Sequence, residues 1–226
     1  MRDFVLVTHT LWQEAPRIRH QLARLLAGAG HRVIFIERAR HLLGAGQPDP
    51  IEVEPGVIVH NGAHKLVIGE PDNTTTPRLQ AVIEMLKRGN MDAQISNDLR
   101  KDIWQKLSLN ASGNTVTAIT LNDLAQVGAD EGLVTVSVNV MKETLAVAAA
   151  QGWDLRAETD CDAAARRGRP GQRTSMMQDA LAGRAMECEA LMGQTQAFAR
   201  ELGIATPTID VMLPLLRGLD RSFRTK

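Results

Sequence analysis

The sequence predicts an α/β region over residues 1–95, followed by an all-helical region over residues 96–226. Short β-branched runs flank one helical pattern near the N-terminus, which is typical of a strand, helix, strand unit in a parallel sheet. From Thr76 onward, helical spacing dominates, and a polar break at 154–171 divides the helical part in two. Such a change along one chain indicates two domains, with a ligand site expected in the cleft between them.

The α/β region begins with a predicted strand, crossover helix and second strand. The strands are the apolar runs DFVLVT at 3–8 and HRVIFIE at 31–37, and the helix is RIRHQLARLLAGAG at 17–30. After a segment rich in Gly and Pro, residues 53–71 show two short apolar runs around Asn61 and Gly62. These turn residues predict an antiparallel β-hairpin that joins the two runs.

Helices are predicted for most of residues 76–226, with one short extended segment at 91–96. The apolar spacing predicts helices over 77–89, about 98–127, about 130–151, 172–183, 185–203 and 207–223. Gly203 can end the fifth helix in the left-handed conformation, and Pro207 suits the first turn of the last one.

Composition narrows the class of protein. The 226 residues are 44% hydrophobic, which is enough for a sizeable core, and 26 basic residues balance 26 acidic ones. We therefore expect neither nucleic acid nor an anionic membrane as a partner. Cys161 and Cys188 have no CxxC spacing, and the six His show no metal-binding motif, so no disulfide framework and no metal are expected. Without a signal-like start or a long apolar run, we expect a cytoplasmic protein.

One row of polar residues interrupts the apolar pattern of the second predicted helix. The segment KLSLNASGN places Lys106, Asn110 and Asn114 four residues apart, so an amine and two carboxamides align on one helix face. Taken alone, such a row is more often a solvated surface than a binding site, because these residue types mostly lie outside.

Several separated blocks resemble the ketopantoate reductases (2-dehydropantoate 2-reductases). The blocks IWQKLSLNASGNTVTAIT and RTSMMQDALAGRAMECEALMGQTQAFARELGIATPTID resemble the family's C-terminal domain. The segments EPGVIVHNGAHKLVIGEPDNTTTPRL and ISNDLRKDIWQKL resemble the stretch between its two domains. The resemblance covers about residues 51–222, with the blocks in the family's order and spacing.

The resemblance implies both a fold and a reaction. The fold is a truncated Rossmann-like region, followed by an all-α domain of the 6-phosphogluconate dehydrogenase C-terminal type. The reaction is the NADPH-dependent reduction of ketopantoate, a small 2-oxo acid, to D-pantoate on the route to pantothenate. A homodimer is compatible with this interpretation.

The resemblance also implies roles for five residues. Lys106 matches the general acid, which is needed because hydride delivered to a carbonyl carbon leaves charge on oxygen. Asn110 and Asn114 match the asparagines that hydrogen-bond the hydroxyl and carboxylate side of the substrate, which carboxamides can do because they both donate and accept. Ser175 matches the serine that holds the substrate carboxylate. Glu187 matches the glutamate near the lysine and the substrate hydroxyl, where a carboxylate would keep the ammonium protonated.

Simpler interpretations compete with some of these roles. Ser175 precedes an apolar run, so it could be a helix N-cap. Glu187 could be a first-turn charge that the helix dipole favours. Flexible filling of the hydrophobic core is the expected role of Met176, Met177, Met186 and Met192.

The N-terminal region departs from the family pattern. A family member has GxGxxG after its first strand, where glycines let backbone amides approach the cofactor pyrophosphate. Here the strand continues into HTLWQEAPR, and Gly28 and Gly30 come only after the predicted helix. The family's central strands have no counterpart either. We therefore expect a composite or internally shortened chain in which cofactor binding is weakened or lost.

Two details of this region bear on the cofactor and on the origin of the chain. Arg38 or Arg40 could meet the 2′-phosphate of NADPH, and the alternative is a solvated loop arginine. The stretch HTLWQEAPRIRHQLARLLAGAGHRVIFIE resembles the opening strand and helix of some glycosyltransferases, although GHRVIFIERARHL fits the reductases' second strand equally well.

Two other functional classes stay open. One is a non-catalytic remnant that binds a small acid without turnover, as the missing glycine loop suggests. The other rests on RRGRPGQR at 166–173, which resembles the AT-hook, a short arm for the minor groove of DNA. The zero net charge of the chain counts against DNA binding.

Overall fold

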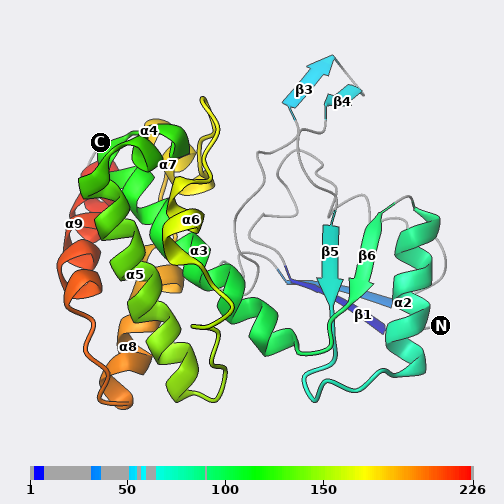
Figure 1. The fold of residues 1–226 in the computed structure, drawn as a ribbon. Helices are drawn as coiled ribbons and strands as arrows, with labels where there is room; N and C mark the ends of the chain where they lie inside the picture. Colours follow the sequence, from blue (N-terminus) through cyan, green and yellow to red (C-terminus); the bar gives the residue numbers. More distant parts are fainter. Residues whose placement is uncertain are drawn as a thin grey trace. The chain divides into compact units, whose positions relative to one another are not determined.

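The computed structural model describes the strands 3–7, 32–36, 51–54 and 57–59, and residues 65–89 and 91–224 (Figure 1). The chain divides into two compact units. The first comprises residues 1–45 and 49–60, and the second comprises 46–48 and 61–226.

The first unit contains a parallel strand pair. β1 (Asp3–Val7) pairs with β2 (Arg32–Ile36) along its whole length, from Asp3 opposite Arg32 to Val7 opposite Ile36. The parallel pair predicted at the N-terminus is therefore confirmed. The helix predicted at 17–30, as well as Arg38 and Arg40, lies outside the described residues.

The predicted hairpin is wrong in its pairing. β3 (Ile51–Glu54) is antiparallel to β4 (Val57–Val59), whereas β5 (Lys65–Ile68) pairs in parallel with β6 (Asp92–Ile95). A hairpin thus exists one strand earlier, where Pro55 and Gly56 separate the strands in the sequence. Pro-Gly is itself a strong turn dipeptide, and the run at 65–68 finds its partner beyond a crossover helix.

That crossover helix is α2 (Pro77–Arg88), as the sequence predicts. Thr76 caps it, because its Oγ1 accepts a hydrogen bond from the Leu79 amide at 3.1 Å, and Pro77 occupies the first turn. The helix turns Ile83 and Leu86 toward Ala93 of β6, where they form a small hydrophobic core. The unit β5–α2–β6 is therefore a complete strand, helix, strand motif.

The next helix ends earlier than the apolar pattern predicts. Instead of one helix over 98–127, the structure has α3 (Leu99–Thr120) and α4 (Leu124–Ala129). Leu121 takes a left-handed conformation with φ of 56° and ends α3. Asp123 then starts α4 with a capping box: its Oδ1 accepts from the Gln126 amide at 2.8 Å, and the Gln126 side chain accepts from the Asp123 amide at 2.9 Å.

α5 (Glu131–Ala150) packs along α3 and has the predicted bounds, with Asp130 as its N-cap. Within the described part of the chain, it is the one helix long and apolar enough to cross a membrane. Its Val134, Met141 and Leu145 pack with Trp104 of α3 in a buried core. This burial accounts for the apolar character of the helix.

Four further segments complete the helical part. They are α6 (Cys161–Arg166), α7 (Ser175–Leu181), the π-helical η1 (Glu189–Gly193) that continues into α8 (Gln194–Glu201), and α9 (Pro207–Arg224). The short helix α6 lies in the segment predicted as a polar break. Gly203 takes φ of 69° after α8, and α9 starts at Pro207, so both boundary predictions are confirmed.

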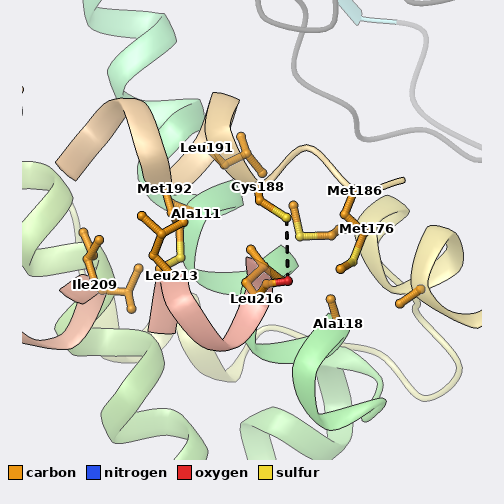
Figure 2. Close-up of a cluster of buried hydrophobic side chains, with 12 residues drawn as sticks. Ala111, Ala118, Met176, Met186, Cys188, Leu191, Met192, Ile209, Leu213 and Leu216 are labelled. Carbon is orange, nitrogen blue, oxygen red and sulfur yellow. Dashed lines mark hydrogen bonds between the residues drawn. The ribbon is translucent and has the colours of Figure 1, made fainter. Parts of the chain in front are cut away.

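The methionines are core residues, as predicted. Figure 2 shows Met176, Met186 and Met192 among side chains from α3, α7, η1 and α9. Met177 is buried as well. In the same cluster, the Cys188 thiol lies 3.9 Å from the Leu216 carbonyl oxygen, to which it donates a weak hydrogen bond. This core fixes α7 against α3, and thereby places the start of α7.

Candidate active site

A pocket of about 300 Å³ lies within the second unit. Its walls come from α3, α4, α5, α6 and α7 and from the loop between α6 and α7. Lys106, Asn110, Asn114 and Ser175, four of the residues that the sequence singles out, all line it. The structure therefore brings together side chains that are up to 69 residues apart in the chain.

The polar row on α3 runs from solvent into the interior. Lys106 is exposed, Asn110 is half-buried, and Asn114 is only 5% exposed. Eight residues of helix separate the first from the last, a rise of about 12 Å. The row is thus neither a wholly solvated face nor a wholly buried one, and a small molecule could lie along it.

Three polar atoms of the pocket residues are buried without a hydrogen-bond partner in the described structure. They are Asn114 Nδ2, Ser175 Oγ and Ser137 Oγ. Leaving such a group unpaired costs about 1–3 kcal/mol, and native proteins seldom tolerate it without a reason. A bound ligand with oxygen atoms would supply the missing partners.

Ser175 is not the N-cap of its helix. Thr174 has that role, because its Oγ1 accepts from the Met177 amide at 3.2 Å. The same hydroxyl lies 2.6 Å from the Thr117 hydroxyl of α3. The N-cap interpretation of Ser175 is therefore wrong, and its own hydroxyl is left for another partner.

The pocket lining is positively charged. Lys106, Arg167 and Arg173 are among its lining residues, and no described carboxylate is. This combination suits an anionic ligand such as a carboxylic acid, because the cations attract it and no acidic side chain repels it.

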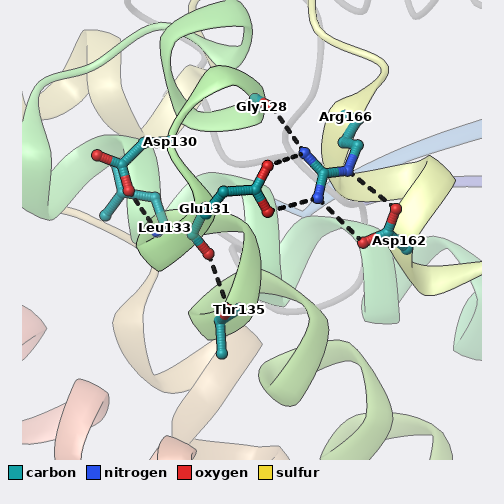
Figure 3. Close-up of polar contacts among 7 residues, drawn as sticks. All are labelled: Gly128, Asp130, Glu131, Leu133, Thr135, Asp162 and Arg166. Atoms are coloured by element: carbon teal, nitrogen blue, oxygen red, sulfur yellow. Dashed lines mark hydrogen bonds and ion pairs between the residues drawn. The ribbon is translucent and has the colours of Figure 1, made fainter.

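Arg166, the neighbour of Arg167, has a structural role. Figure 3 shows its guanidinium held by Glu131 on one side and by Asp162 on the other, with N–O distances of 2.8 and 2.9 Å for Glu131 and 2.9 Å for its Nε to Asp162. These hydrogen bonds raise the pKa of Arg166 and lower the pKa of Glu131. The pairs tie α6 to the start of α5.

The loop after α6 packs tightly against α4. A Cβ atom added at Gly168 would lie 2.1 Å from the Leu124 carbonyl carbon, so only glycine fits there. The Leu124 amide donates to the Gln172 carbonyl at 3.0 Å, and the Gly171 amide donates to Asp123 Oδ2 at 2.8 Å. The segment RRGRPGQR is thus the end of α6 followed by a packed loop, which carries Arg167 and Arg173 to the pocket.

Replacing Gly168 with alanine should therefore destabilise the helical unit. The added methyl group would overlap the α4 backbone, and overpacking of this kind typically costs about 1–3 kcal/mol in free energy of unfolding. Urea denaturation measures the change. Gly218→Ala is the control, because its added Cβ would meet its nearest neighbour at an ordinary 3.8 Å. Equal stability of Gly168→Ala and the wild type would contradict this packing.

The attachment of the loop after α6 to the start of α4 should depend on pH, because the Asp123 carboxylate accepts a hydrogen bond from the loop. Hydrogen bonds from the Gln126 and Gly171 amides lower the pKa of Asp123. A carboxylate whose pKa is lowered on folding stabilises the folded protein at pH values above the ordinary aspartate pKa of about 4. That stabilisation is lost as the pH falls through the lower pKa of the folded state. We expect Asp123→Asn to melt below the wild type at neutral pH, with the difference shrinking in acid. A difference that does not change with pH would refute this.

Glu187, a further predicted site residue, does not line this pocket in the described chain. Glu187 is half-buried and lies just before η1, where its carbonyl accepts from the Leu191 amide at 3.2 Å. It is not among the pocket-lining residues of the described chain, so its partnership with Lys106 stays a prediction. Arg38 and Arg40 lie outside the described residues.

Ser137, like Arg167 and Arg173, lines the pocket but was not predicted from the sequence. It is a single serine on the apolar helix α5, with no motif around it. Its one signal is structural: the hydroxyl is buried, unpaired and in the lining of the same pocket as the α3 row.

Comparison with known proteins gives consistent matches. The sequence model described as "Ketopantoate reductase PanE/ApbA C terminal" matches residues 98–220. A 2-dehydropantoate 2-reductase of Mesorhizobium japonicum is 32% identical over 181 residues, which span 80% of this chain and 56% of that protein. One of Caulobacter vibrioides is 30% identical over 234 residues, which span 96% and 77%.

A solved structure shares the fold. The dimeric ketopantoate reductase of Staphylococcus aureus superposes with a TM-score of 0.72 at 18% identity, over 98% of this chain and 79% of that one. By its match to the Mesorhizobium relative, which covers 56% of that protein, the chain spans little more than half of the relative's length.

Proposed function

The chain belongs to the ketopantoate reductase family, and we propose that its helical pocket binds ketopantoate for NADPH-dependent reduction to D-pantoate. The observation that carries the proposal is the α3 row. Lys106, Asn110 and Asn114 line one pocket together with Ser175, and two of these four side chains have buried polar atoms without a partner.

Each group of the substrate has a counterpart in the lining. The carboxylate would meet the Ser175 hydroxyl in a pocket where Arg167 and Arg173 supply positive charge. The two asparagines can donate to oxygen and accept from a hydroxyl. Leu109, Met141 and other apolar side chains would receive the methyl groups.

Lys106 would carry the proton transfer. When bound, the nicotinamide cofactor supplies hydride to the ketone carbon, and the former carbonyl oxygen then gains negative charge. The Lys106 ammonium can stabilise that charge and donate the proton that completes the alcohol. Its position at the exposed end of the row suits a group that must be protonated again from water after each turnover.

The cofactor side rests on the sequence alone. We propose that Arg38 or Arg40 meets the 2′-phosphate of NADPH, and that binding is weak because no glycine occurs between Val7 and Gly28.

The missing glycines also favour a second candidate, a protein that binds the 2-oxo acid without reducing it. A homodimer suits either function. Arg166 and Gly168 of the AT-hook-like segment are engaged within the fold, which counts against DNA binding.

Calorimetric titration of the purified chain separates the two candidates. We expect ketopantoate to bind at one site per chain, and NADPH to bind weakly but saturably. Ketopantoate binding without any NADPH binding would favour the non-catalytic candidate. Failure of ketopantoate to bind a well-folded protein would contradict both.

A further inference from the structure

Arg167 lacks the carboxylate partner that other arginines of the second unit have. Five of them hold a carboxylate at hydrogen-bond distance: Arg78 with Glu70, Arg156 with Asp154, Arg166 with Glu131, Arg184 with Asp179, and Arg217 with Glu189. No hydrogen bond or ion pair of the Arg167 side chain is found within the described part of the chain, although Arg167 lines the pocket. Its guanidinium can therefore bind a ligand without first giving up a partner.

The backbone on both sides of Arg167 is fixed by packing. The preceding residue, Arg166, has its guanidinium held by two carboxylates (Figure 3), and a Cβ atom added at Gly128 of α4 would lie 3.1 Å from the Arg166 Cα atom. The following residue, Gly168, packs against the backbone of Leu124. An arginine on such a fixed segment gives up less conformational freedom on binding than one on a free loop. The packing thus holds Arg167 at the pocket before a ligand arrives.

The pocket has more cations than a 2-oxo acid with one carboxylate needs. Lys106 would act on the ketone oxygen, and Arg173 precedes Ser175, the proposed partner of the carboxylate, by two residues. Arg173 also lies near Asp123, because backbone hydrogen bonds and the charge of Arg173 together lower the pKa of that carboxylate. Arg167 comes from the other end of the loop, where α6 ends. A substrate with one carboxylate would leave Arg167 without an anion.

We propose that Arg167 is a specificity-determining residue that binds a second carboxylate, at the end of the 2-oxo acid remote from its ketone. The inference rests on the proposed function, and it gives the pocket a further substrate class, the 2-oxo dicarboxylic acids. A guanidinium suits this group because it can donate two parallel hydrogen bonds to one carboxylate. The pocket volume of about 300 Å³, at the lower end of the range for small-molecule sites, limits the acid to a short chain.

The test compares 2-oxopentanedioate with 2-oxopentanoate by calorimetric titration of the full chain without cofactor. The two acids have the same carbon chain, and a methyl group replaces the second carboxylate in the latter. At low salt, we expect the wild type to bind the dicarboxylic acid about 10-fold more tightly, because hydrogen bonds between charged groups are stronger than neutral ones. Added salt should reduce this preference, since Arg167 is exposed. In Arg167→Gln, the preference should fall to about 2-fold or less, because the other cations of the pocket are engaged elsewhere.

Arg169→Gln is the matched control. Arg169 lies on the same loop and is exposed, but it does not line the pocket in the described structure. This variant should keep the wild-type preference, which separates a site at Arg167 from the general charge of the loop. A full preference that survives in Arg167→Gln, or an equal loss in both variants, overturns the assignment of Arg167.

Ketopantoate, titrated in parallel, separates failure of this inference from failure of the proposed function. A folded wild type that binds ketopantoate but does not prefer the dicarboxylic acid overturns this inference alone. A folded wild type that binds none of the three acids overturns the proposed function as well.

Discussion

Replacing Lys106 with alanine is expected to lower the turnover number for ketopantoate by about 100- to 10,000-fold, which is the usual contribution of a general acid. Without the ammonium, nothing else in the described α3 row can both stabilise the developing negative charge and donate a proton. The Michaelis constant should change much less, because the ketone is only one of several polar groups that the pocket would hold. Steady-state kinetics with NADPH measures both values.

The control for this variant is Lys101→Ala. Lys101 lies on the same helix, pairs with Glu158 at 2.8 Å, and does not line the described pocket. Its loss should leave turnover within about 2-fold of the wild type, because an exposed ion pair contributes little. If Lys106→Ala turns over as fast as Lys101→Ala, Lys106 is not the general acid.

Replacing Asn114 with leucine should weaken ketopantoate binding by about 10- to 100-fold without destabilising the fold. The Asn114 side chain is buried with its Nδ2 unpaired, so the ligand-free protein becomes more stable when an apolar side chain of similar size replaces it. The bound ligand, in contrast, loses one hydrogen bond, which is worth about 1.5–3 kcal/mol if its acceptor is a charged carboxylate. Calorimetry and thermal melting on the same samples measure the two effects.

Asn139→Leu is the matched variant on α5. Asn139 is exposed and does not line the described pocket, so its replacement should change neither binding nor melting temperature by much. A parallel loss of affinity and stability in Asn114→Leu would indicate a structural residue rather than a binding residue.

Helix boundaries were predictable where capping residues mark them. Asp130, Gly203 and Pro207 stand at ends that the structure confirms. The break after Thr120 was missed, although Asp123 and Gln126 form a recognisable capping box, because the apolar spacing continues through it. The short helix α6 buries Cys161 and Ala165 in the hydrophobic core, but its six residues are too few for an apolar period to be recognised in the sequence.

Strand pairing was less predictable than strand position. The apolar runs at 57–59 and 65–68 are both strands, but they pair with different partners. Proximity in sequence favoured a hairpin around Asn61 and Gly62. The parallel partner of β5 lies beyond α2, and a local pattern of residues carries no information on such a distant partner.

Part of the site was visible in the sequence because it obeys helix geometry. The spacing of Lys106, Asn110 and Asn114 fixes them on one face of α3, and the pocket lies along that face. Ser137 and the arginines of the loop after α6 reach the pocket only through tertiary packing. Gly168 and Asp123 position that loop, and neither residue signals this role before the contacts are known.

The most direct test of the central claim is the oxidation of NADPH by the purified wild-type chain in the presence of ketopantoate, followed by absorbance. The proposed function predicts saturable turnover that requires both compounds and yields D-pantoate in equal amount to the NADPH consumed. A folded protein that binds ketopantoate but consumes no NADPH at any concentration of the cofactor would contradict it.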